Sequence, residues 1–230
     1  MRTPTGLVAH SLLGGLTLLS AGAIVLSLVT APPVAQEQLR LAAKATSAAG
    51  SFVLTDMNRI STPAPSAALG GKSSATSTVR IVYQSPDRIL DRVSESSGQT
   101  VTLLLVGDRA FEKVGNAAWS QVPPGSLTST GADAARSVLR PLGSLSSATS
   151  VVLSGQTYRF VSGNQLSLLE DLLGAQATGQ LSSVHFSAQL SGEFVGSETL
   201  VVDEGTFRDS IHFVYSSVDH APPVEVPASS

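Results

Sequence analysis

The sequence predicts an α+β protein: a strongly curved antiparallel β-sheet with short helices packed on its concave face, preceded by one N-terminal hydrophobic helix. Most of the chain alternates apolar and polar residues with a period of two, in short segments separated by turns rich in Gly, Asp, Asn and Ser. A few segments instead show helical periodicity. An uncharged apolar run occupies residues 11–31.

The N-terminal run, SLLGGLTLLSAGAIVLSLVTA, is long enough to cross a hydrocarbon core of about 30 Å as a helix. An uncleaved anchor and a cleaved signal peptide both remain open. The apolar region of a signal peptide covers about 7–15 residues, and this run is longer. Proline also follows the small-residue site that ends at Ala31, which disfavours cleavage there. We expect residues 1–35 to be a signal anchor or signal peptide, and residues 36–230 to form one domain on the extracytoplasmic side of the membrane.

The composition excludes several classes of partner. Charged residues make up 13% of the chain, about half of the roughly 25% usual in soluble domains, and the net charge is −3. No basic stripe is present to neutralise phosphates, so no nucleic-acid partner is expected. The chain has no cysteine, which excludes disulfides, thiolate metal sites and a lipid-modified N-terminal cysteine.

The first half of the domain shows one helical segment followed by strands. QEQLRLAAKATSAA has the spacing of a short, weakly amphipathic helix, and the Pro/Gly/Ser-rich stretch STPAPSAALGGKSSATS is typical of a flexible loop. Gly-Asp and Gly-Asn pairs mark two hairpin turns. The expected elements are a helix over 36–49, a strand over 51–60, a loop over 61–77, and strands over 78–84, 89–96 and 100–107.

The second half begins with a change of period. GADAARSVLRPL carries a helical apolar stripe that should end near Pro141, and NQLSLLEDLLG predicts a helix between Asn164 and Gly174. The final strands alternate cleanly, which is typical of a sheet covered on one side and wet on the other. The expected elements are a helix over 131–142, a strand pair over 150–163, a helix over 164–174, and strands over 182–190, 192–203 and 206–217.

The strand TVTLLLV is apolar on both faces, so both faces should be covered. A curved sheet closed by small helices can enclose an apolar hollow, although a solid core fits the same pattern. We take as candidate ligand-binding residues those on the more apolar side of each strand, a choice that is nearly arbitrary for Leu103 and Leu105 over Leu104 and Val106. The candidates are Val79, Ile81, Tyr83, Leu103, Leu105, Phe186, Phe213 and Tyr215.

The sequence offers no catalytic or metal-binding pattern. His185 and His212 fall on the polar faces of their strands, and no histidine pair has the H-x-x-x-H spacing of a zinc site. No G-x-S-x-G motif occurs, and GGKSS has Ser66 where a phosphate-binding loop requires its first glycine. We therefore expect no enzyme, no metal and no cofactor.

Several motifs resemble those of LolA-like and LppX/LprG-like proteins of the bacterial envelope. In the front half they are the turn Ser85-Pro86-Asp87-Arg88, the hairpin Val106-Gly107-Asp108, the strand Phe111-Glu-Lys113 and Trp119. In the back half, SGQTYRFVSG precedes a helical segment and a meander that ends in IHFVYSSVDHAPPVEVP. The similarity covers residues 37–228, but this chain lacks the cysteine of the lipoprotein members.

The resemblance implies a half-open β-barrel over a helical lid, with an apolar cavity for acyl chains of lipids, lipoproteins or glycolipids. It implies an envelope protein for lipid transport or envelope maintenance, held at the membrane by its N-terminal segment or secreted after cleavage. The C-terminal tail should lie against the sheet margin, anchored by Val224 and Val226. The alternative is a non-enzymatic envelope sensor or scaffold that binds a partner protein.

Overall fold

The computed structural model describes residues 34–94, 100–123, 130–163, 169, 183–204 and 206–227. The anchor or signal segment expected before residue 34 lies outside the described residues, as does the helix expected over 164–174 except for Leu169. Leu169 is helical and fully buried in the main core. No helix in the described ranges combines the length and the apolarity needed to span a bilayer.

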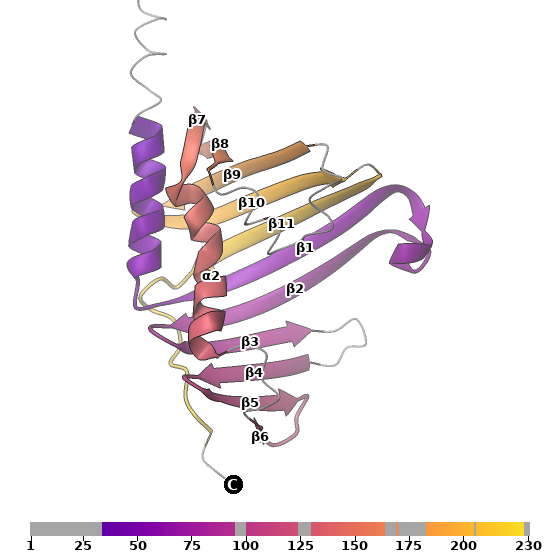
Figure 1. Ribbon diagram of the computed structural model, residues 1–230, viewed down its shortest axis with the longest axis vertical. Coiled ribbons are helices and arrows are strands. Elements are labelled where there is room, and N and C mark those ends of the chain that lie inside the picture. Colours follow the sequence, from indigo (N-terminus) through magenta and orange to yellow (C-terminus); the bar gives the residue numbers. More distant parts are fainter. Residues whose placement is uncertain are drawn as a thin grey trace, which may run out of the picture.

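The described residues form eleven strands in one antiparallel sheet, in the order β6-β5-β4-β3-β2-β1-β11-β10-β9-β8-β7. Two meanders, one from each half of the chain, are joined where the first strand pairs with the last (Figure 1). Over the described residues the sheet is curved and does not close, so β6 and β7 are its edges. The strands are β1 Ser51–Ser66, β2 Lys72–Gln84, β3 Arg88–Ser94, β4 Thr100–Val106, β5 Arg109–Val114, β6 Ser120–Val122, β7 Ala148–Ser154, β8 Thr157–Ser162, β9 Ser183–Ser191, β10 Phe194–Glu204 and β11 Phe207–Ser216.

The loop expected over residues 61–77 is instead the end of a long hairpin. β1 continues beyond the expected end at Ile60 to Ser66, and β2 begins at Lys72, ahead of the expected start at Thr78. A short 3-10 turn, Ala67–Leu69, joins the two strands, whose pairing extends to Ser66 and Lys72. The prolines fall where the register shifts between Ser61 and Ser66, and an irregular stretch tolerates a residue without an N–H. The expectation was wrong because strand pairing satisfied the backbone of a Ser/Thr-rich segment that has no apolar pattern of its own.

The N-terminal helix and helix α2, Gly131–Ser146, lie against the same, concave side of the sheet, here called the inner face (Figure 1). The N-terminal helix covers residues 34–48, close to the expected 36–49. Helix α2 begins with a capping box in which Thr130 Oγ1 accepts from the backbone N–H of Asp133 and the Asp133 carboxylate accepts from the N–H of Thr130.

Helix α2 does not end near Pro141 as expected. It continues for more than one further turn to Ser146 because Leu142 and Leu145, both fully buried, hold the following turn against the sheet. Ser147 ends the helix, and its hydroxyl donates to the carbonyl oxygen of Gly143 at 3.0 Å. Burial of these side chains outweighs the unfavourable effect of a proline inside a helix.

Apolar clusters cover both faces of the sheet. The main core fills the space between the inner face and the helices, and a smaller cluster on the outer face contains Val53, Val82, Leu104, Phe111 and Val224. The expectation that the strand now called β4 is covered on both faces is therefore confirmed. The open, curved sheet with helices on its concave side is the expected α+β fold with a half-open barrel.

The C-terminal tail covers the smaller apolar cluster on the outer face. Val224 is 2% exposed, its N–H donates to Gln84 Oε1 at 3.2 Å, and Arg88 Nη1 donates to its carbonyl oxygen at 3.2 Å. Val226 is half-buried against the same cluster. The tail thus packs on the outer face where β2 ends and β3 begins, and Val224 and Val226 anchor it to the apolar cluster as expected.

Candidate functional site

The strand register places the candidate ligand-binding residues on the inner face. Tyr83, Leu105, Phe186, Phe213 and Tyr215 are buried in the main core. Ile81 and Leu103 pack against it half-buried, and Val79 is half-buried further along β2. The uncertain choice on β4 is resolved in favour of Leu103 and Leu105 for the inner face, since Leu104 belongs to the outer cluster and Val106 packs against it.

Aromatic side chains occupy much of the inner face. The ring of Phe52 lies 4.9 Å from that of Tyr83 and 5.6 Å from that of Tyr215, measured between centroids. Phe160 and Phe186 form a second pair at 5.5 Å. These distances are typical of packed aromatic pairs. In this conformation, the part of the inner face beneath the helices is therefore filled by side chains.

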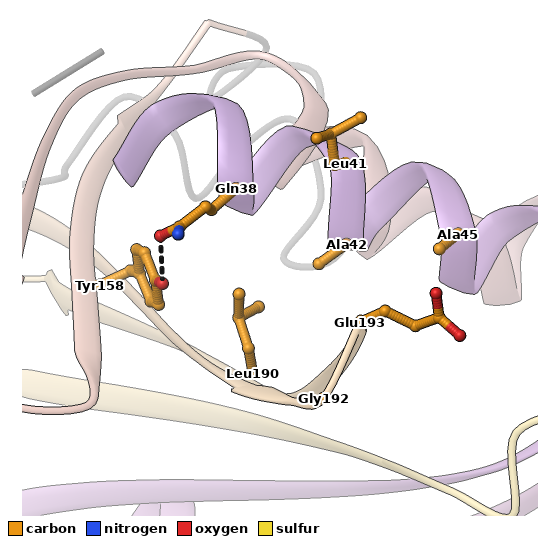
Figure 2. A pocket seen from close by; sticks show the side chains of 8 residues that line it. All are labelled: Gln38, Leu41, Ala42, Ala45, Tyr158, Leu190, Gly192 and Glu193. Atoms are coloured by element: carbon orange, nitrogen blue, oxygen red, sulfur yellow. Dashed lines mark hydrogen bonds between the residues drawn. The ribbon is translucent and has the colours of Figure 1, made fainter. Parts of the chain in front are cut away.

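A cavity of about 590 Å³ opens between the N-terminal helix and the strands β8 and β9 (Figure 2). The helix contributes Gln38, Leu41, Ala42 and Ala45, and the sheet contributes Tyr158, Leu190, Gly192 and Glu193. Small alanine side chains on the helix leave this space open. None of the candidate ligand-binding residues lines it, so whether they contact a ligand remains a prediction.

A hydrogen bond joins the helix to the sheet at one end of this cavity, which we call the helix pocket. The phenol of Tyr158 donates to Gln38 Oε1 at 3.0 Å, as Figure 2 shows. Nearby, Gln36 Nε2 donates to the carbonyl oxygen of Ala148 at 2.9 Å. Both bonds tie the start of the N-terminal helix to the β7–β8 hairpin. The helix pocket is thus an apolar space with a few polar groups, the usual composition of a small-molecule site.

Carboxyl groups also point to the inner face, at Asp56, Asp91, Glu198 and Asp209. Burial raises the pKa of Asp56 to about 6, with additional contributions from Asp209 and Asp91. Burial alone raises the pKa of Asp91 to about 6. With a pKa of about 6 both groups are mostly ionised at neutral pH, and their negative charge makes this part of the inner face unfavourable for an anionic ligand.

Glu198 is the most deeply placed of these acids. It is 1% exposed beneath α2, and its Oε1 accepts a hydrogen bond from the hydroxyl of Ser144. Burial raises its pKa to about 8, against the opposing effect of the Ser144 hydrogen bond. Among the described residues, neither Glu198 Oε2 nor the hydroxyl of Tyr215 has a hydrogen-bond partner. At neutral pH Glu198 is therefore mostly protonated.

His185 and His212 lie on the opposite face of the sheet from these acids. His212 lies on the outer face, where its Nδ1 is 2.8 Å from Thr199 Oγ1 in a polar depression of about 330 Å³. His185 is exposed on the same face. In the described part of the chain, no group of three or more His, Asp or Glu side chains is positioned to hold a metal ion.

Comparison with solved structures identifies the fold. LprF from Mycobacterium bovis superposes with a TM-score of 0.54 at 10% sequence identity, covering 86% of this chain and 99% of LprF. The chain has the LprF fold. The expectation drawn from the LolA-like and LppX/LprG-like resemblance is therefore confirmed for the fold.

Two other solved structures give weaker superpositions. A LolA superfamily protein from Nitrosomonas europaea has a TM-score of 0.32 at 8% identity, covering 79% of this chain and 92% of its own. A DUF1329 family protein from Desulfovibrio piger has a TM-score of 0.29 at 9% identity, covering 80% and 92%. No protein-family model matches the sequence, and no curated protein matches it.

Sequence reasoning missed the inward carboxyl groups, although a signal was present. Asp56 follows Leu54 at a spacing of two, Asp91 follows Ile89, and Asp209 precedes Ile211 in the same way. A period of two places each acid on the face of its apolar neighbour. The helix pocket had no such signal, because its walls come from segments more than a hundred residues apart in the sequence.

Proposed function

We propose that this chain is a non-enzymatic protein of the bacterial envelope that binds an acyl chain of a lipid or lipoprotein, for lipid transport or envelope maintenance. The helix pocket is the observation that carries this proposal. Its volume of about 590 Å³ lies within the range of roughly 300–1,000 Å³ found for ligand sites. Leu41, Ala42, Ala45 and Leu190 provide the apolar walls that an acyl chain requires.

The energetics of burial suit this function. Each buried CH₂ group contributes about 0.8 kcal/mol, so a chain of ~16 carbons gains on the order of 12 kcal/mol before ordering costs are subtracted. Binding of this kind needs an apolar pocket and no catalytic group. The LprF fold supports the proposal at the level of architecture, and the apolar run at residues 11–31 supports an extracytoplasmic location.

A direct test is the binding of a fluorescent fatty-acyl probe to the purified chain. Leu190→Trp should fill the helix pocket and lower the affinity for the probe several-fold. Ser120→Trp, on β6 at the opposite edge of the sheet, is the matched control and should bind like the wild type. Organic extraction followed by mass spectrometry should recover an acylated molecule from the wild type. A wild-type chain that neither binds the probe nor yields a lipid would contradict the proposal.

A second candidate function, an envelope sensor or scaffold that binds a partner protein, is favoured by one observation. Several candidate ligand-binding residues, including Leu105 and Phe213, are packed at 4% and 3% exposure. In a solid core, Phe213→Trp should cost roughly 1–3 kcal/mol of stability, whereas in an expandable hollow it should cost little and displace the acyl probe. Strong destabilisation together with no probe binding by the wild type would favour the scaffold.

A further inference from the structure

Exposed apolar side chains gather at one end of the molecule. Val34 and Leu41 on the N-terminal helix are 57% and 50% exposed. Val152, Leu153 and Val161 on the β7–β8 hairpin are 61%, 46% and 51% exposed. Of the large apolar side chains that are exposed in the described ranges, Val114 alone lies elsewhere. We call Val34, Leu41, Val152, Leu153 and Val161 the apolar end.

The apolar end borders the helix pocket. Leu41 lines the pocket from the helix and Tyr158 lines it from β8, and Leu153 is the cross-strand partner of Tyr158. The hydrogen bond from Tyr158 to Gln38 and the one from Gln36 to Ala148 hold the two elements together. In Figure 1 the beginning of the N-terminal helix lies beside β7. A molecule that contacts the apolar end is therefore next to the pocket.

The hairpin exposes apolar side chains on both of its faces. The burial of β8 alternates strictly, with Tyr158 and Phe160 turned inward and Arg159 and Val161 turned outward. Val152 pairs with Arg159 and shares its outward face, whereas Leu153 pairs with Tyr158 on the inner side. A protein docking on the sheet would cover one of these faces. A bilayer interface surrounds an inserted hairpin edge and so contacts both faces.

The charge of the hairpin also favours a bilayer interface as the surface that it contacts. Arg159 is exposed between Val152 and Val161, and no acidic group among the described residues forms an ion pair with it. An arginine flanked by apolar side chains can reach anionic headgroups while its neighbours enter the apolar layer below them. The flanking valines are too few to span a membrane but enough to insert at its interface.

The position of the apolar run adds an independent constraint. The run ends at Ala31, and the N-terminal helix is described from residue 34. Three residues span at most about 10 Å. If the run is embedded in a membrane, the beginning of the helix, and with it the apolar end, is held within a short distance of the membrane surface.

We propose that the apolar end docks on the bilayer surface and that acyl chains pass from the membrane directly into the helix pocket. The route of entry rests on the proposed acyl-binding function, whereas the docking itself does not. The chain meets the bilayer with Val152, Arg159 and Val161, and the opposite edge of the sheet at β6 faces away from it.

The chain has no native cysteine, so single labels can test the docking in the full-length protein. Val152→Cys and Val161→Cys carry an environment-sensitive fluorophore, and Ser120→Cys on β6 is the matched control. Each labelled chain is reconstituted into vesicles of phosphatidylcholine and phosphatidylglycerol. Nitroxide-bearing lipids should quench the labels at 152 and 161 several-fold more than the label at 120.

Two outcomes would overturn the docking proposal. One is equal quenching by nitroxide lipids at all three positions. The other is protection of the labels at 152 and 161 from aqueous iodide without quenching by nitroxide lipids, which would mean that protein covers the apolar end.

A separate experiment tests whether acyl chains enter the helix pocket from the membrane. The double variant Val152→Asp with Val161→Asp should slow the pick-up of a fluorescent lipid from vesicles several-fold and leave the affinity for a soluble acyl probe unchanged. Ser120→Asp is the control for added charge. Unchanged pick-up would overturn the entry route. A wild type that binds no acyl probe would instead refute the proposed function, and the quenching experiment would still decide whether the apolar end docks on the bilayer.

Discussion

Gly131, the first residue of α2, lies where the helix touches the turns that flank β3 and β4. A Cβ at this position would meet the carbonyl oxygen of Asp87 at 2.3 Å and that of Gly107 at 3.0 Å. The backbone N–H of Gly131 donates to that Gly107 oxygen at 2.8 Å. Glycine is required here because two backbones approach closely.

Gly131→Ala should therefore destabilise the protein by roughly 1–3 kcal/mol, the usual cost of overpacking against atoms that cannot move aside. Urea denaturation measures the difference. Gly50→Ala is the matched control, because its Cβ would meet Asp219 Oδ1 at 3.6 Å, an ordinary contact, and the variant should be close to wild type. Equal stability of the two variants would show that the start of α2 is not held as described.

Glu198 should make stability fall as the pH rises. Its pKa is about 8 in the folded protein against an ordinary value of 4.5, so the folded state retains a proton that the unfolded chain releases. Its contribution is complete below pH 4.5 and is lost progressively up to about pH 8. Protonated Asp56 and Asp91 also stabilise the folded state, and their contribution is lost as the pH rises through about 6.

Glu198→Gln isolates this effect above about pH 7, because groups with a pKa of about 6 are half ionised at pH 6 and largely ionised only about one unit higher. The melting temperature of the wild type should decrease between about pH 7 and 8, and that of the glutamine variant should change little. Glu193→Gln, in the exposed β9–β10 turn, is the control and should keep the wild-type slope. A wild-type melting temperature that rises over this range would contradict the buried, protonated state of Glu198.

Among the elements, the C-terminal tail shows how an extended segment without strand pairing stabilises a sheet. Val224 covers Val53, Val82, Leu104 and Phe111, which would otherwise face water. Deleting residues 221–230 should lower stability by about 2–3 kcal/mol through the loss of this apolar burial. Deleting only residues 227–230 retains Val224 and Val226 and should have little effect. Equal melting temperatures for all three chains would show that the tail does not pack on the sheet in solution.

At the scale of the whole molecule, the apolar run before the domain predicts how the protein partitions in the cell. The native protein should remain with membranes after a high-salt wash, because apolar insertion is not screened by salt. Peptide mapping should recover residues that precede Ala31. Recovery only of chains that begin after Ala23, Ala31 or Ala35 would identify the run as a cleaved signal peptide.

The sequence by itself determined most strands and the face to which each side chain belongs. The final meander, the double cover of β4 and the buried anchor Val224 all follow from a period of two, which depends on neighbouring residues only. The same rule placed Ile81, Leu103 and Phe213 on the inner face and would have placed Asp56 and Asp91 there as well. Local pattern is sufficient for these features because a strand has only two faces.

Tertiary structure alone decided the features that join distant segments. Residues 72–77 became a strand because they pair with residues 58–61 and Ser66 of β1, and α2 passed Pro141 because the sheet buries Leu142 and Leu145. Pairing of β1 with β11 set the strand order, and packing of the N-terminal helix against β8 created the helix pocket. Each outcome depends on free energy gained between residues far apart in the chain, and no local periodicity encodes which distant partner a segment will meet.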